Sequence, residues 1–103
     1  MEDYVTLERS DDVMIVRFDR QGALNAFDQK MITELTDTAK LLAEDLTVRS
    51  VVLTGSTNAF SSGIDLKDTQ NWDLEAMSDL EIRRRFYRGV RLCQAWEGLP
   101  QIT

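Results

Sequence analysis

Histidine is absent from the 103 residues of this chain, and cysteine and proline each occur once. Without histidine, the chain holds no Ser-His or Cys-His pair for nucleophilic catalysis and no zinc site that requires imidazole. The lone Cys93 cannot form an intrachain disulfide, which favours a reducing compartment, and we therefore expect a cytoplasmic protein. We interpret Cys93 as a structural thiol in a helix rather than as a nucleophile.

Basic residues and long apolar runs are also scarce. The chain has 12 Lys and Arg residues against 18 Asp and Glu residues, which gives a formal net charge of -6. An acidic chain is a poor match for a phosphate backbone, so we expect no nucleic-acid partner. No apolar run is long enough to span a bilayer, and the first residues, MEDYVTLERSDD, are acidic. We therefore expect neither a signal peptide nor a membrane segment.

One stretch departs from this acidity, because it contains Arg83, Arg84, Arg85, Arg88 and Arg91. Their spacing distributes the five side chains around most of a helix. A solvated helix face is the preferred interpretation, and a phosphate-binding site is the alternative.

The first half of the chain predicts the order strand, strand, helix, strand within one small domain. Residues 4–8 alternate apolar and polar side chains, and the apolar run 13–18 follows after a turn, so we expect an antiparallel hairpin. Asp28 is placed to cap an amphipathic helix over 29–45, and the run 50–55 predicts a strand parallel to an earlier one. The apolar stripe expected for the helix is Ile32, Leu35, Ala39, Leu42, Ala43 and Leu46.

The second half predicts an irregular, mobile segment over 69–77 and then a second helix. Ser78 and Glu81 have the spacing of a capping box, and Gly98 followed by Pro100 indicates the end of this helix. Its expected apolar stripe is Ile82, Phe86, Val90, Cys93 and Trp96. The last residues, PQIT, look like the start of a further strand, so we expect a longer protein.

The stretch NAFSSGIDLKD, residues 58–68, is the candidate site. Small residues precede Ile64 and Asp65, which we expect to begin a helical turn, so that their N–H groups lack partners within the helix. Such donors suit a thioester oxygen or a phosphate, and ligands of this fold class gather beyond the carboxyl ends of the strands. A tight turn with no ligand is the alternative interpretation.

This stretch resembles the motif A-F-[SC]-[AS]-G-x-D-[LI]-K of the crotonase, or enoyl-CoA hydratase/isomerase, superfamily. The stretches VMIVRFDRQGALNAFDQKMITEL, VRSVVLTG and EGLPQIT also resemble that family, in the same order and spacing. The resemblance implies an α/β fold of repeated ββα units, of which residues 1–103 would form the N-terminal part. It also implies assembly as a trimer or as a hexamer built from two trimers.

The resemblance implies an acyl-CoA thioester as substrate, with coenzyme A as part of that substrate and with no other cofactor and no metal. In this family two backbone N–H groups hold the thioester oxygen as it becomes an enolate, and the first corresponds here to the N–H of Ile64. The residues implied to bind substrate or CoA are Ala23, Leu24, Gly63, Ile64, Asp65, Leu66 and Lys67. Lys67 would reach a CoA phosphate or the adenine, or would simply be solvated, whereas Asn25 is better interpreted as structural.

The chain departs from the family pattern at two positions. Arg20-Gln21 stands where the family often has Arg-Pro, and Ile64 stands where a small residue is common. The larger side chain narrows the site for the acyl group. The second oxyanion donor and the acid/base carboxylates of the family would come after PQIT, and we assign no catalytic role to Glu75 or Glu81.

Three hypotheses follow for the function. The first is an enoyl-CoA hydratase/isomerase-like enzyme of which these 103 residues alone are inactive. The second is a non-catalytic truncated module that binds CoA or a partner. The third is a serine hydrolase using Ser61 or Ser62, which the absence of histidine disfavours.

Overall fold

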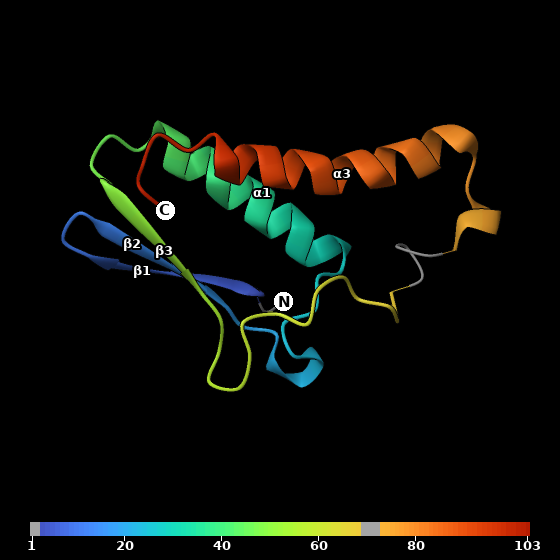
Figure 1. The fold of residues 1–103 in the computed structure, drawn as a ribbon, viewed down its shortest axis with the longest axis horizontal. Coiled ribbons are helices and arrows are strands. Elements are labelled where there is room, and N and C mark those ends of the chain that lie inside the picture. Colours follow the sequence, from blue (N-terminus) through green and yellow to red (C-terminus); the bar gives the residue numbers. More distant parts are fainter. Residues whose placement is uncertain (1–2, 69–72) are drawn as a thin grey trace.

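The computed structural model describes residues 3–68 and 73–103. Strands β1 (Val5–Ser10), β2 (Val13–Phe18) and β3 (Ser50–Thr54) form one sheet in that order. Helix α1 (Gln29–Glu44) connects β2 to β3, and helix α3 (Asp79–Glu97) lies along α1 (Figure 1). Two short 3-10 helices, η1 (Gln21–Ala23) and η2 (Leu74–Ala76), complete the described elements. No helix in the described ranges is both long and apolar enough to cross a membrane.

The strand topology predicted from the sequence is confirmed. β1 and β2 pair antiparallel with Val5 opposite Phe18, whereas β2 and β3 pair parallel with Val13 opposite Ser50. A parallel pair needs a crossover connection, and α1 provides it. Consequently the carboxyl ends of β2 and β3 lie at the same edge of the sheet, and the loops that follow both strands meet there.

Helix α1 begins as expected, because the side chain of Asp28 accepts a hydrogen bond from the N–H of Met31. Its buried face differs in part from the predicted stripe. Met31 is fully buried, whereas Ala43 and Leu46 are exposed. The helix ends at Glu44, so Leu46 no longer shares its register and is 95% exposed.

Helix α3 also begins as predicted, with the Ser78 hydroxyl accepting from the N–H of Glu81, and it ends before Gly98. The predicted apolar stripe is wrong at Phe86, Val90 and Cys93, which are exposed, the first two at 68% and 47%. The physical reason is rotation: the face of α3 that packs on α1 carries Arg85 and Arg88, which bind Gln29 of α1, and not Phe86 and Val90. The last turns of this face cover the core. There Leu92 is buried and Trp96 donates to the carbonyl of Leu35.

Part of the segment expected to be irregular, residues 69–72, lies outside the described residues. Its remainder contains η2, so the expectation of irregular chain over 73–77 is only partly right. The last residues do run beside the sheet, because Ile102 forms a parallel bridge with Ser50. Cys93 lies in α3 as expected, although it is exposed.

Candidate active site

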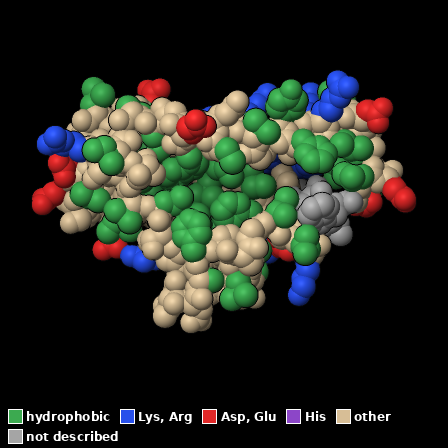
Figure 2. Space-filling model, viewed as in Figure 1, with side chains coloured by type: hydrophobic (Ala, Val, Ile, Leu, Met, Phe, Trp, Pro, Cys, Tyr) green, Lys and Arg blue, Asp and Glu red, His purple; other side chains and the backbone are tan. Residues whose placement is uncertain are grey.

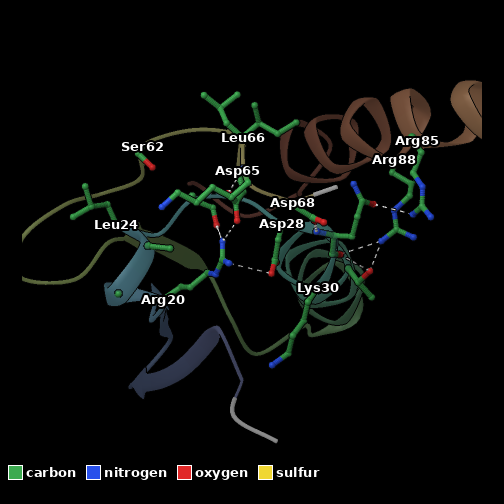
Figure 3. Close-up of a pocket in the computed structure, with 17 residues that line it drawn as sticks. Arg20, Leu24, Asp28, Lys30, Ser62, Asp65, Leu66, Asp68, Arg85 and Arg88 are labelled. Carbon is green, nitrogen blue, oxygen red and sulfur yellow. Dashed lines mark hydrogen bonds and ion pairs between the residues drawn. The ribbon is translucent and has the colours of Figure 1, made fainter. Parts of the chain in front are cut away.

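A cleft of about 1070 Å³ opens at the carboxyl edge of the sheet. Four pieces of chain surround it: the loop after β2, the first turns of α1, the segment 62–68 and one side of α3 (Figure 3). The first and third of these are the loops that β2 and β3 bring together. The cleft therefore lies where ligands of α/β folds are usually found.

Asn25 connects the two loops. Its side chain is fully buried, and its amide nitrogen donates to the carbonyl oxygens of Ala59 and Phe60 at 3.0 and 3.2 Å and to the Ser56 hydroxyl at 2.9 Å. Its amide oxygen accepts from the N–H of Arg20 at 2.8 Å. The interpretation of Asn25 as a structural residue is thus confirmed.

Arg20 makes a second connection on the wall of the cleft. Its Nη1 donates to Asp65 Oδ2 and to the carbonyl of Ala26, both at 2.8 Å, and its Nη2 lies 3.5 Å from Asp28 Oδ2. The hydrogen bond from Arg20, together with one from the N–H of Lys67, lowers the pKa of Asp65. Burial alone would lower the pKa of Arg20, but its bond to Asp65 and the charge of Asp28 raise it overall. Both groups are therefore held in their charged forms.

The backbone at Ile64 is not helical, so the expectation of a helical turn beginning at Ile64 and Asp65 is wrong. Ile64 instead forms a parallel bridge with Phe27, in which Phe27 donates to the carbonyl of Gly63 and accepts from the N–H of Asp65. In such a parallel bridge, one residue bonds to the two neighbours of its partner, and the partner's own N–H and C=O point away from it. Here that partner is Ile64. Within residues 3–68 and 73–103 nothing accepts a hydrogen bond from the N–H of Ile64.

The first turn of α1 is fixed by two carboxylates from different parts of the chain. Asp28 accepts from the N–H of Met31, and Asp68 accepts from the N–H of Gln29 at 3.1 Å. Carboxylates at a helix N-terminus satisfy donors that have no partner within the helix and complement its dipole. Asp68 thereby anchors the end of the segment that begins at Ser62.

The structure brings most of the predicted site residues to this cleft. Its lining includes Ala23, Leu24, Ile64, Asp65, Leu66 and Lys67. Gly63 does not line it; its positive φ of 96° and its bonds to Phe27 and Ser61 shape the chain before Ile64. Asp65 is only 9% exposed and is bound to Arg20, so its observed role is to hold the segment in place.

Sequence reasoning missed three features of the site: the Arg20 ion pairs, the cap by Asp68, and the presence of Arg85 and Arg88 in the cleft. Asp28, Asp65 and Asp68 gather near the start of α1. The sequence indicates this cluster only if the two loops are already known to meet. The arginines offered no signal beyond their charge.

The residues of the hydrolase hypothesis have other contacts. The Ser61 hydroxyl donates to the carbonyl of Asn25 at 2.8 Å and accepts from the N–H of Gly63. Ser62 is exposed at the cleft. Among the described residues no group of three or more His, Cys, Asp or Glu side chains is arranged to hold a metal ion.

The model of the family described as enoyl-CoA hydratase/isomerase matches residues 8–94. The chain belongs to the enoyl-CoA hydratase/isomerase family. Its crotonase-like α/β fold, matching the N-terminal part of that fold, is thereby confirmed as the sequence predicted.

Individual members of the family show the extent of the likeness. A probable mitochondrial enoyl-CoA hydratase of Dictyostelium discoideum is 37% identical over 65 residues, which are 63% of this chain and 24% of that protein. A mitochondrial enoyl-CoA hydratase of Pongo abelii is 36% identical over 72 residues, 67% of this chain and 25% of that protein. The crystal structure of an enoyl-CoA hydratase of Mycobacterium smegmatis superposes with a TM-score of 0.82 at 31% identity, covering 97% of this chain and 38% of that one. The chain thus matches about a quarter of the length of these curated relatives.

Proposed function

We propose that this chain forms part of an enzyme that processes an acyl-CoA thioester through an enolate, with the N–H of Ile64 as one donor to the thioester oxygen. One observation carries the proposal: in a chain of this family, that N–H has no acceptor among the described residues and belongs to a residue that lines an open cleft. An unpaired donor held in fixed orientation suits an oxygen on which negative charge develops.

The surrounding residues supply the fixed orientation. The bridge to Phe27 uses the groups of Gly63 and Asp65 on either side, which leaves the N–H of Ile64 for a ligand. Arg20 then holds Asp65, so the donor is placed before substrate arrives. Losing one such donor costs about 3 kcal/mol of transition-state stabilisation in other enzymes.

The rest of the substrate is proposed to lie along exposed side chains that line the cleft. Leu24 and Leu66 are 53% and 76% exposed and present apolar surface to a pantetheine arm, with Ala23 beside them. Lys67 is exposed and makes no ion pair within the described parts of the chain, so its ammonium suits a CoA phosphate. The chemistry is proposed to need no cofactor other than the CoA of the substrate, and the protein to be cytoplasmic.

A change of the backbone tests the donor, because a side-chain substitution does not remove an N–H. An ester bond in place of the amide between Gly63 and Ile64 deletes this donor, which no structural hydrogen bond uses, and it also weakens the Gly63 carbonyl as the acceptor of the Phe27 N–H. We expect butyryl-CoA binding, measured by isothermal titration calorimetry, to weaken about tenfold with loss of one hydrogen bond. Ile64→Ala is the matched control, which keeps the N–H and widens the site. Equal binding of butyryl-CoA by the ester variant and the parent chain would exclude the N–H of Ile64 as a donor to the thioester.

We propose that the 103-residue chain alone is inactive, since the second donor and the general acid/base expected from the resemblance are not among its residues. Hydration of crotonyl-CoA by this chain at the rate of a full-length enoyl-CoA hydratase would contradict this.

The second candidate is a non-catalytic module that binds CoA or a partner. The first half of α3 favours it, because Leu80, Phe86 and Tyr87 are 61%, 68% and 58% exposed. Apolar side chains also gather on the face shown in Figure 2. Exposed apolar surface of this kind often marks a contact with another protein chain.

We propose that the intact protein assembles as a trimer or hexamer. Sedimentation equilibrium measures the oligomeric state, and a monomer at all concentrations would contradict this proposal.

A further inference from the structure

Arg85 and Arg88 lie one turn apart on α3 and line the cleft from the side opposite Leu24 (Figure 3). Asp65 and Leu66 lie between that loop and the two arginines in the same view. A ligand that enters over Leu24 and passes Asp65 and Leu66 therefore continues toward the arginines. Under the proposed function CoA lies along Leu24 and Leu66, and the arginines lie beyond both, so we assign this end of the cleft to the acyl group.

Among the described residues, the two guanidinium groups donate only to neutral acceptors. Arg85 Nη1 donates to Gln29 Oε1 at 3.4 Å, and Arg88 Nη2 donates to the Gln29 carbonyl at 3.2 Å and to the Thr33 hydroxyl. The Nε of Arg88 is buried and has no hydrogen-bond partner in the described structure. No carboxylate lies within ion-pairing distance of either arginine across residues 3–68 and 73–103.

The carboxylates of the cleft are held elsewhere. Asp28 and Asp65 pair with Arg20, and Asp68 caps the N–H of Gln29. Two positive charges at the acyl end of the cleft thus lack a carboxylate partner among the described residues, in a chain whose net charge is -6. A partly buried guanidinium is stabilised by a carboxylate partner, which its planar fork of donors binds well.

We propose that Arg85 and Arg88 bind a carboxylate at the far end of the acyl group, so that the ligand is the CoA thioester of a dicarboxylic acid. This inference rests on the proposed acyl-CoA function and narrows it from acyl-CoA in general to acyl groups that carry a negative charge. Both arginines line the cleft; Arg88 has an Nε without a partner among the described residues, and the hydrogen bond of Arg85 to Gln29 is long, at 3.4 Å.

Isothermal titration calorimetry on this chain tests the proposal. It compares the affinities of succinyl-, glutaryl- and adipoyl-CoA with those of butyryl-, pentanoyl- and hexanoyl-CoA, the neutral thioesters of the same carbon number. We expect at least one carboxylated thioester to bind at least about tenfold more tightly than its neutral counterpart, because a charged hydrogen-bonded pair contributes that much to the affinity. Arg85→Gln and Arg88→Gln should each abolish that preference, and Arg85→Lys should restore part of it. Arg84→Gln, an exposed residue of α3 outside the cleft, is the control and should keep the preference.

The remaining outcomes separate the two proposals. If charged and neutral thioesters bind equally, the carboxylate site is excluded and the acyl-CoA function stands. If the glutamine variants weaken binding of free CoA as much as that of the carboxylated thioesters, the arginines bind CoA phosphate and the inference is wrong. If no CoA thioester binds, the proposed function fails and the inference with it. Circular dichroism identifies a variant that does not fold, and the comparison of thioesters on the parent chain needs no variant.

Discussion

The Nη1 of Arg20 lies 2.8 Å from the Oδ2 of Asp65, a contact between residues 45 positions apart in the chain. The same guanidinium contacts the carbonyl of Ala26 and the carboxylate of Asp28. One side chain therefore holds the loop after β2, the cap of α1 and the segment that presents Ile64. Because Asp65 directly follows Ile64, this ion pair bears on both stability and the position of the proposed donor.

Replacing Asp65 by Asn should lower the free energy of unfolding by about 2 kcal/mol, the contribution of a charged hydrogen bond in a partly buried setting. Urea denaturation of the parent chain and the variant measures the change. Asp37→Asn makes the same substitution at an exposed position of α1 and should change stability by less than about 0.5 kcal/mol. Equal losses in both variants would mean that the ion pair contributes nothing.

The stabilisation by Asp65 should depend on pH in a defined direction. Its pKa is lowered in the folded state by hydrogen bonds from Arg20 and from the N–H of Lys67. The stabilisation is therefore complete above the unfolded-state pKa of about 3.9 and is lost as pH falls through the lower, folded-state pKa. The difference in melting temperature between the parent chain and Asp65→Asn should thus be constant near neutral pH and shrink in strong acid. A difference that stays constant down to strongly acidic pH would contradict the lowered pKa.

The order of elements was predictable because each depends on local signals. The alternation in β1, the apolar run of β2 and the Asp28 and Ser78 caps mark their elements within a few residues of sequence. The buried face of α3 was not predictable in this way. Phe86 and Val90 continue an apolar stripe, yet which face of α3 is buried depends on how the helix is rotated against α1, and Arg85 and Arg88 face α1 instead.

The site was predictable only as far as its motif. The stretch 58–68 indicated Ile64 and its neighbours, and six of the seven predicted binding residues line the cleft. The reason given for the unpaired N–H was wrong, since a bridge to Phe27 replaces the expected helical turn. That bridge, like the Arg20–Asp65 and Gln29–Asp68 contacts, joins residues more than thirty positions apart, and no local sequence pattern indicates such a pairing.

Asn25 should be the most sensitive residue of the loop that precedes the site. Its φ of 56° is in the left-handed region, and its buried side chain binds Arg20, Ser56 and two carbonyls. Asn25→Gly removes only the side-chain bonds and should cost about 3 kcal/mol, because it leaves several buried groups unsatisfied. Asn25→Ala should cost about 1 kcal/mol more, since alanine also strains this backbone. Urea denaturation compares the two, and equal losses would show that the backbone conformation contributes no strain.

Gly55 should tolerate no side chain, in contrast to another glycine of the same chain. A Cβ at Gly55 would overlap the carbonyl oxygen of Ala59 and the Cα of Phe60, and backbone atoms cannot rotate away as a side chain can. Gly55→Ala should therefore destabilise the chain by about 2 kcal/mol through overpacking. Gly89, within α3, has open space around its Cβ position, so Gly89→Ala should stabilise the chain by about 1 kcal/mol through helix propensity.

The same substitution is thus expected to have opposite signs at the two glycines, which thermal unfolding measures directly. The loop that Gly55→Ala would displace contains the carbonyls that Asn25 holds, at Ala59 and Phe60. Binding of butyryl-CoA should consequently weaken in Gly55→Ala and stay unchanged in Gly89→Ala. If Gly55→Ala kept both its melting temperature and its affinity, the close approach of the loop to the end of β3 would not be what positions Ile64.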